Sequence, residues 1–247
     1  MISKLDLQSI INKYYLSGLN ETVKWDIKDK NLNIKFTSPT REMIGEVNYN
    51  SFKLEDSTVG ISNTTQLLKL IGITSGDLLL SYTKNNKQFI KLIISDNQFT
   101  VDYALADILT VPKAGSYNGP DVFNLVTELT EEHITALIKA KSALPESTTV
   151  IIQPSFSLDN DFQVELVFGG DIEYANKVSY CLSNFEQNDA SPTFRLGFSS
   201  DLLKEILSVN RDSIKTKMSL NLEGLMKLEF QTSEGIKSTY YIVKKDI

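Results

Sequence analysis

The residue types that most often carry enzyme chemistry are scarce in this chain of 247 residues. The chain has one histidine, His133, and one cysteine, Cys181. A Ser–His–Asp or Cys–His arrangement would depend on His133 alone. This residue lies early on a predicted amphipathic helix, without a nucleophile motif, which favours a histidine on the polar face of that helix. We therefore expect a protein that is not an enzyme.

Metal and cofactor motifs are weak as well. Cys181 has no cysteine or histidine at the spacing of a metal site. Asp159, Asp161 and Asp171 flank a predicted hairpin, where turn formation explains them better than metal binding. The pair Gly169-Gly170 stands alone, without the glycine pattern of a phosphate-binding loop. We expect neither a metal nor a cofactor.

The composition is that of an ordinary globular protein, with 41% hydrophobic and 23% charged residues. No apolar run approaches the roughly 18 residues of a transmembrane helix, and the N-terminal residues lack the apolar region of a signal peptide. A single cysteine fits a reducing compartment. We expect a cytoplasmic location, in an infected host cell if the protein is viral, and no membrane partner.

The elements that would position any site follow a recurring order. In the first half, the apolar spacing predicts helices at residues 4–16 and around 67–71. Strands are predicted at 21–27, 31–36, 43–49, 52–61, 77–82, 88–94 and 99–105. Residues 109–120 (LTVPKAGSYNGP) hold two prolines and two glycines and indicate an extended connector.

The second half repeats this material. Helices are predicted after Thr130, a plausible N-cap, and around 202–207. Strands are predicted at 122–129, 149–155, 162–168, 175–185, 193–198, 214–220, 225–231 and 238–243. A short sequence echo supports the repeat: VGIS at 59–62 and LGFS at 196–199 each precede a helix with a Leu-Leu-Lys run. We predict an α+β protein with domains at 1–108 and 121–247 and a connector at 109–120.

A helix followed by three antiparallel strands cannot bury its apolar stripe alone. Two such units packed together can do so, which gives each domain two helices on antiparallel sheets. Edge strands left at the ends of the chain would favour aggregation. Head-to-tail closure of several subunits into a ring pairs every edge, with the helices lining the hole.

At this point the chain resembles the DNA sliding clamps, those of tailed phages and proliferating cell nuclear antigen. The resemblance covers nearly the whole chain. It rests on the leucine-rich first helix and on five segments: residues 128–138 (ELTEEHITALI), 177–182 (KVSYCL), 193–198 (TFRLGF), 225–230 (LMKLEF) and 240–243 (YYIV).

The resemblance implies a homotrimeric ring with the DNA-clamp fold. Such a clamp encircles double-stranded DNA without sequence preference and tethers a DNA polymerase as a processivity factor. An ATP-dependent clamp loader opens and closes the ring, and in some phages the clamp also serves late-transcription factors. A net charge of -6 argues against a nucleic-acid partner only if the charge is evenly spread. A ring with an acidic outside and a mildly basic hole avoids that objection.

The candidate DNA-binding residues are cations on the expected inner helices. Their long basic side chains attract phosphates weakly, which allows the ring to slide along DNA. They are Lys4, Lys13, Lys69, Lys139, Lys141, Lys204 and Arg211. Acidic residues share the same helices, so the basic excess is small, and each cation is about equally well explained as part of a solvated helix face.

By family position, partner peptides are expected in an apolar pocket beneath the connector. Its candidate residues are Met43, Ile44, Leu109, Val111, Pro112, Tyr241 and Val243. The alternative for the strand residues among these is an ordinary place in the core or in the strand alternation. Two other functions stay open: a polymerase accessory subunit of this fold that forms no ring, and a β-rich phage structural or assembly protein.

Overall fold

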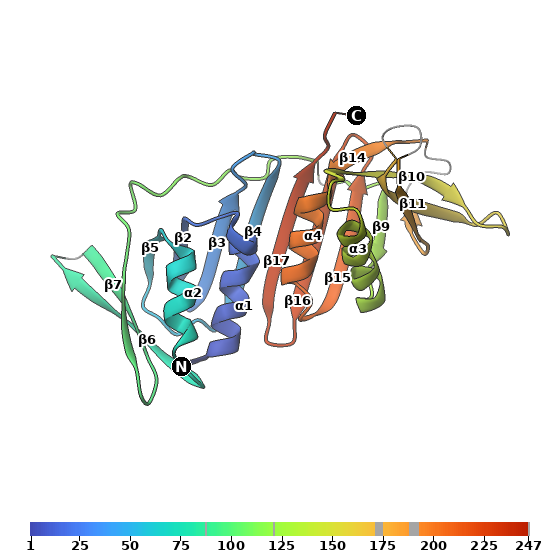
Figure 1. Cartoon of the computed structure of the whole chain (residues 1–247). Coiled ribbons are helices and arrows are strands. Elements are labelled where there is room, and N and C mark those ends of the chain that lie inside the picture. The colour runs from blue at the N-terminus through green and yellow to red at the C-terminus, as the bar shows by residue number, and fades with distance from the viewer. Residues whose placement is uncertain (87, 121, 171–174, 188–192, 247) are drawn as a thin grey trace. The chain divides into compact units, whose positions relative to one another are not determined.

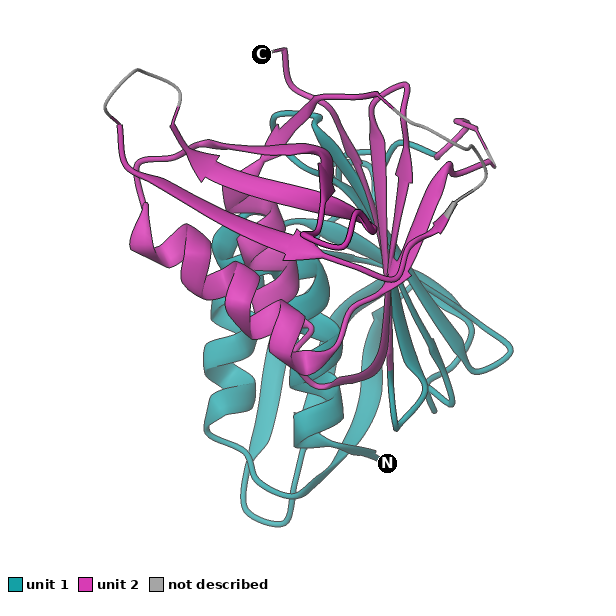
Figure 2. Ribbon diagram, turned by 90° about the vertical axis from the view of Figure 1, so that its right-hand side faces the viewer, with its two compact units in different colours: residues 1–116, 232–238 teal, residues 117–231, 239–247 magenta. Residues whose placement is uncertain are grey.

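The computed structural model describes residues 1–86, 88–120, 122–170, 175–187 and 193–246. Asp171, one of the turn aspartates, lies outside this part. The chain divides into two compact units, which Figure 2 shows in different colours. Unit 1 comprises Met1–Ser116 and Thr232–Ser238, and unit 2 comprises Tyr117–Gln231 and Thr239–Ile247. Each is described by itself below.

In unit 1, two α-helices lie side by side over strands (Figure 1). The helices are α1 (Lys4–Tyr15), continued by the 3-10 turn η1 (Leu16–Gly18), and α2 (Thr64–Gly72). One antiparallel sheet has the order β1-β6-β7-β8, with β1 (Ile2–Ser3), β6 (Asp77–Asn85), β7 (Gln88–Ser95) and β8 (Thr100–Ala104). A second set runs β4-β3-β2-β5, with β2 (Val23–Lys28), β3 (Asn31–Thr37), β4 (Met43–Asn50) and β5 (Ser57–Ile61).

In unit 2, the helices α3 (Glu131–Ala143) and α4 (Ser200–Val209) pack against each other. One sheet has the order β12-β11-β10-β14, with β10 (Thr149–Phe156), β11 (Phe162–Gly169), β12 (Lys177–Leu182) and β14 (Leu196–Ser199). The other strands run β13-β9-β15-β16-β17, with β9 (Leu125–Glu128), β13 (Glu186–Gln187), β15 (Ser213–Asn221), β16 (Leu225–Thr232) and β17 (Ile236–Val243).

The two units share one topology. The order β4-β3-β2-β5 in unit 1 matches β12-β11-β10-β14 in unit 2, and β1-β6-β7-β8 matches β9-β15-β16-β17. The sequence echo marks equivalent positions in this topology. Gly60 on β5 forms an isolated bridge with Ala106, which follows β8, and Gly197 on β14 forms one with Lys245, which follows β17. The predicted repeat is therefore a structural repeat.

Local sequence explains where the helices begin. The side chains of Ser3, Asn63 and Ser199 each accept a hydrogen bond from a first-turn N–H of α1, α2 and α4. At α3, Thr130 is the predicted N-cap, and the N–H of Thr130 in turn donates to Nδ1 of His133. His133 thus completes a capping box, which gives this histidine a structural role at the start of α3.

The helices bury the apolar stripes that the sequence predicts. Leu7, Ile10 and Ile11 of α1 are fully buried, and α1 packs against α2 and β4. In unit 2, Leu137 of α3 is 1% exposed, and α3 packs against α4 and β12. No helix in the described ranges is long and apolar enough to cross a membrane.

Some strand boundaries differ from the sequence prediction. The strand expected at 52–61 begins only at Ser57. Residues 51–56 form a connection instead, because the N–H groups of Ser51 and Phe52 both donate to the carbonyl of Lys30. Phe52 is nevertheless fully buried, which is why its apolar character resembles that of a strand residue. The strands expected from 122 and 193 begin at Leu125 and Leu196.

Candidate functional site

The first part of the connector packs against unit 1. Val111 is 4% exposed and lies against β5, where a Cβ atom on Gly60 would come within 2.8 Å of Cγ2 of Val111. Further on, the N–H of Gly115 donates to Oγ1 of Thr37 at 2.9 Å. Leu109, by contrast, is 89% exposed. The segment from Val111 to Gly115 is therefore a strap held on unit 1 at both ends.

A cleft of about 750 Å³ lies beside this strap in unit 1. Its walls come from residues 19–23, from the end of β3 with the following turn, from Ile44 and from connector residues 112–115. Phe36, Ile44 and Pro112 supply apolar surface, and the exposed cations Lys35, Arg41 and Lys113 are also part of the lining. The cleft thus combines an apolar floor with positive charge.

The structure places the candidate pocket residues in different surroundings. Ile44 and Pro112 line the cleft. Met43 is 1% exposed and belongs to the core, because it alternates with Ile44 along β4. Tyr241 and Val243 lie in unit 2 on β17, where Tyr241 is half-buried and Val243 is 46% exposed.

Tyr241 belongs to a group of four side chains in unit 2, which we call the aromatic cluster: Tyr117, Phe123, Lys227 and Tyr241. The rings of Tyr117 and Tyr241 stack, with centroids 3.8 Å apart and planes 9° from parallel. Nζ of Lys227 lies 5.8 Å from the ring centroids of both Phe123 and Tyr241. It also lies 2.8 Å from the carboxylate of Glu229.

Four of the seven candidate DNA-binding cations reach the surface. Lys69 of α2, Lys139 of α3 and Arg211 in the turn after α4 are exposed, and Lys204 of α4 is half-buried. Lys139 shares a shallow depression with the exposed residues Glu131 and Glu132. The positive charge on the helices is therefore modest, as the sequence indicates.

The other three cations are engaged inside their units. Nζ of Lys4 donates to the carbonyls of Gly72 and Thr74. Lys13 is fully buried. Lys141 is 3% exposed and donates to the carbonyls of Pro145 and Ser147 at 2.8 and 2.7 Å. These ammonium groups are held in the protein interior or against backbone carbonyls.

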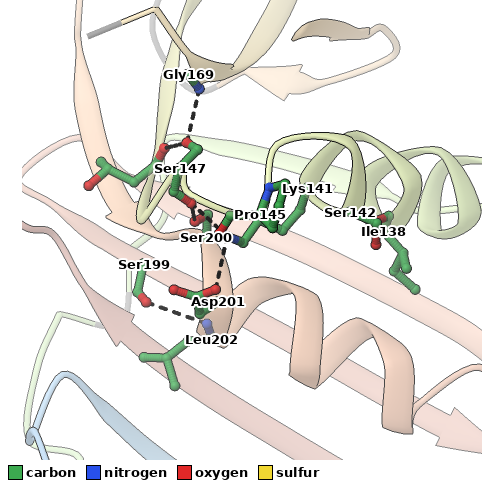
Figure 3. Close-up of polar contacts among 11 residues, drawn as sticks. Ile138, Lys141, Ser142, Pro145, Ser147, Gly169, Ser199, Ser200, Asp201 and Leu202 are labelled. Carbon is green, nitrogen blue, oxygen red and sulfur yellow. Dashed lines mark hydrogen bonds and ion pairs between the residues drawn. The ribbon is translucent and has the colours of Figure 1, made fainter. Parts of the chain in front are cut away.

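Figure 3 shows the surroundings of Lys141, where a polar network joins α3, α4 and β11. The side chain of Lys141 reaches the loop after α3 and also Asp201 in the first turn of α4. The hydroxyl of Ser200 donates to the carbonyl of Ser147 at 2.5 Å, and the hydroxyl of Ser147 accepts from the N–H of Gly169. The network is a structural joint rather than a ligand site.

Two edge strands are relevant to assembly. β8 ends one sheet of unit 1, and β12 ends one sheet of unit 2. Within the described ranges, each leaves one side of its backbone without a neighbouring strand. Both alternate in exposure: Val101 and Tyr103 of β8 are buried, and Ser179 and Cys181 of β12 are exposed. Such edges favour pairing with another chain.

Several of these residues have no signal in the sequence. Tyr117 lies in a segment that predicts only an extended connector, and its stacking partner is far along the chain. The cations Lys35 and Arg41 come together with Lys113 only through folding. No group of three or more metal-ligating side chains is found among the residues that the structure describes.

No protein-family model matches the chain, and no curated protein sequence matches it. Solved structures do match. Proliferating Cellular Nuclear Antigen from Entamoeba histolytica is 18% identical at a TM-score of 0.76, covering 99% of this chain and 96% of that chain. PCNA of A. fulgidus, solved with the C-terminal region of FEN-1 bound, is 16% identical at 0.77, covering 100% and 97%.

A third match is the PCNA2-PCNA3 complex from Sulfolobus tokodaii, 13% identical at a TM-score of 0.74, with 99% of this chain and 98% of that chain covered. All three structures are PCNA sliding clamps, and each match extends over nearly the full length of both chains. The predicted α+β clamp fold is thereby confirmed: the chain has the fold of the PCNA sliding clamps.

Proposed function

We propose that the chain is one subunit of a ring-shaped sliding clamp that encircles duplex DNA and tethers a DNA polymerase as a processivity factor. The observation that carries the proposal is the match to PCNA structures over nearly the whole chain, at TM-scores of 0.74–0.77. The internal repeat supports it, since each chain brings two equivalent units to the assembly.

Ring closure would use the two edge strands. β8 of one copy pairs with β12 of the next, in the same sense at each junction, so that neither of these two edges stays open. Three chains with two units each give six units around the hole. In this arrangement the domains are residues 1–108 and 121–247, with the connector at 109–120.

The DNA would be held by charge alone. Lys69, Lys139, Lys204 and Arg211 are the surface cations of the helices and of the turn after α4, and they attract phosphates without reading bases. A small number of such contacts gives weak, salt-sensitive binding, which permits sliding. Lys4 and Lys141 instead bond backbone carbonyls within their own units, and Lys13 is buried.

Partner proteins would bind the cleft beside the strap. In the A. fulgidus structure, the bound partner is the C-terminal region of FEN-1. The apolar residues Phe36, Ile44 and Pro112, with Lys35, Arg41 and Lys113 around them, suit a peptide with apolar anchors and nearby carboxylates. We assign this cleft to the polymerase and to an ATP-dependent clamp loader. In a phage it would also serve late-transcription factors.

Topological retention tests the proposal. The protein is diluted to separate the chains and then concentrated in the presence of nicked circular DNA, so that rings can close around the circle without a loader. The complex is passed through a sizing column in 0.5 M salt, which removes proteins held by charge alone. The protein is expected to stay with the circle and to be released when a restriction enzyme linearises it. Equal loss from circular and linear DNA would favour an accessory subunit that forms no ring, and no binding to either would contradict a role at DNA.

A further inference from the structure

The hairpin β10–β11 of unit 2 ends in an apolar tip, residues 156–162, which Figure 1 shows in yellow at the far end of the two strands. Leu158 is fully exposed there, and Phe156 is 60% exposed. The rings of Phe156 and Phe162 pack edge to face, with centroids 6.1 Å apart. Neighbouring exposed apolar side chains, unlike single scattered ones, mark an interaction surface.

The hairpin tip keeps its shape through its own hydrogen bonds. The N–H of Ser157 donates to the carbonyl of Asp161 at 2.9 Å, and the N–H of Asn160 donates to the carbonyl of Ser157 at 3.0 Å. The hydroxyl of Ser157 also accepts from the N–H of Asp161. Leu158 is thus presented on a closed turn, so that binding through it orders little additional chain.

The sheet itself does not require an apolar tip. In the structural repeat, the equivalent hairpin of unit 1 is β2–β3, whose turn consists of Asp29 and Lys30. The last apolar side chains of that hairpin, Ile27 and Leu32, are 3% and 1% exposed. The same sheet is thus completed in unit 1 without exposed apolar residues, which points to a role for the hairpin tip of unit 2 outside its own sheet.

The charges of the hairpin tip complement those of the cleft beside the strap. Asp159 and Asp161 place exposed carboxylates next to Leu158. The cleft is lined by the exposed cations Lys35, Arg41 and Lys113, and none of these forms an ion pair with a described residue. A leucine beside two carboxylates therefore has the chemistry that an apolar floor surrounded by cations can bind.

We propose that the hairpin tip of one copy of this chain docks into the cleft of another copy. Leu158 lies on the apolar floor of the cleft, and the two carboxylates lie near its cations. Each copy carries one tip and one cleft, so one kind of contact joins successive copies. The docked tip occupies the cleft that we assign to partner proteins, so that clamps at high concentration cover each other's partner sites. This occlusion rests on the proposed function, whereas the contact between copies does not.

The contact is weak. A single turn buries far less than the roughly 1,200 Å² at which stable interfaces begin, and exposed ion pairs add little each. We expect a dissociation constant of about 0.1–1 mM. The contact therefore forms in concentrated protein, and a partner segment that binds the cleft more tightly displaces the hairpin tip.

Sedimentation equilibrium of the full chain tests the contact, at concentrations that bracket the expected dissociation constant. The average mass of the wild type should rise above that of the species present at low concentration, and 0.5 M salt should reduce the rise. Leu158→Ser should weaken this association by roughly tenfold or more. Leu109→Ser is the matched control, because Leu109 is also an exposed leucine but lies outside the cleft lining. It should associate like the wild type.

An exchange of charges identifies the two surfaces. One form of the full chain carries Asp159→Lys and Asp161→Lys, and the other carries Lys35→Glu and Arg41→Glu. Each form alone sets like charges against each other and should associate at least roughly fivefold more weakly than the wild type. An equal mixture of the two forms brings opposite charges together again, so its association should return towards that of the wild type.

A wild-type mass that stays constant over this concentration range would overturn the inference. Equal association of Leu158→Ser and Leu109→Ser would do so too, as would a mixture of the charge-exchanged forms that associates no better than each form alone. All the substituted side chains are exposed, so the variants should fold like the wild type, which circular dichroism checks. Retention on circular DNA is measured on the same proteins. Association without retention would refute the ring alone, and retention without association would refute the docked tip alone.

Discussion

The ammonium group of Lys141 lies 2.9 Å from the carboxylate of Asp201, although the two side chains are 3% and 61% exposed. The ion pair is thus open to water on one side only. On its buried side, Lys141 also donates to the carbonyls of Pro145 and Ser147. Asp201 lies in the first turn of α4 and Lys141 in the last turn of α3, so the Lys141 side chain connects both helices and the loop that follows α3.

Replacement of Lys141 by methionine should destabilise unit 2 strongly. The change keeps the length of the side chain but removes the donor to the carbonyl of Pro145, one of the two donors to the carbonyl of Ser147, and the partner of Asp201. The expected cost is about 1–3 kcal/mol in the free energy of unfolding. Asp201→Asn is the matched control and should cost less than about 1 kcal/mol, because Asp201 is largely exposed. Urea unfolding followed by circular dichroism measures both, and similar losses for the two variants would contradict the assignment.

Gly60 should not tolerate a methyl group. A Cβ atom there would lie 2.9 Å from the carbonyl oxygen of Ala106 and 2.8 Å from Val111, so Gly60→Ala should destabilise the protein by about 1–3 kcal/mol. It should also expose the connector to proteases, because the Val111 anchor is disturbed.

Gly72→Ala provides the comparison. Gly72 is the last residue of α2 and has no atom within 4 Å of the added methyl group. This change should leave stability equal or raise it by up to about 1 kcal/mol. Thermal unfolding and limited proteolysis distinguish the two glycines, and a Gly60→Ala protein as stable as Gly72→Ala would refute the close packing.

The turn before β8 should show a characteristic pH dependence. Hydrogen bonds from the backbone N–H groups of Phe99 and Gln98, and then of Ser75, lower the pKa of Asp96 below its usual value. A lowered pKa means that the stabilisation is present above the ordinary aspartate pKa near 4 and is lost as the pH falls through the lowered value.

Asp96→Asn should therefore be less stable than the wild type at pH 7, with a difference that narrows below about pH 4. Urea midpoints at several pH values provide the measurement. A stability difference between the wild type and Asp96→Asn that stayed constant down to pH 2 would show that the turn hydrogen bonds do not depend on the charge of Asp96.

Charge reversal at the exposed helix cations should weaken contact with DNA. The double change Lys69→Glu and Lys139→Glu removes up to two phosphate contacts in each of the three chains, so the slope of log affinity against log salt should become shallower by up to about five. Lys53→Glu, an exposed change in the connection before β5, should leave the slope unaltered. Binding to nicked circles at a series of salt concentrations measures all three proteins, and equal slopes would exclude these helices from the DNA contact.

Periodicity alone predicts the helices and most of the strands, because residues such as Leu7, Ile10 and Ile11 have a spacing that only one buried face satisfies. The same spacing places Lys141 on the apolar face of its helix, three residues after Ile138. Its charge suggests a surface role, whereas its place on the apolar face indicates burial. Only the structure shows the carbonyls that compensate for that burial.

Contacts between distant segments are outside the reach of pattern analysis. The stack of Tyr117 on Tyr241 joins residues on opposite ends of unit 2 in sequence, and the cleft brings Lys35, Arg41 and Lys113 together across three segments. Phe52 shows the converse error, since a buried aromatic residue in a connection has the same local signature as one in a strand. Local sequence propensity does not show which distant segments come into contact, and these features depend on such contacts.

The edge strands offer a direct chemical test of how copies meet. Cys181 on β12 is exposed, and Asp102 on β8 is exposed as well. If β8 of one copy pairs with β12 of the next, a cysteine at 100, 102 or 104 should form a disulfide with Cys181 of a neighbouring chain under mild oxidation. Cysteine in place of the exposed Lys53 should not produce closed oligomers.

The measurement that tests the ring most directly is the native mass of the unmodified protein in solution, recorded from nanomolar to tens of micromolar concentration. The account predicts a species of three 27.7 kDa chains that stays on nicked circular DNA and leaves it on linearisation. A protein that remains monomeric throughout this range, and that circular DNA does not retain, would contradict it.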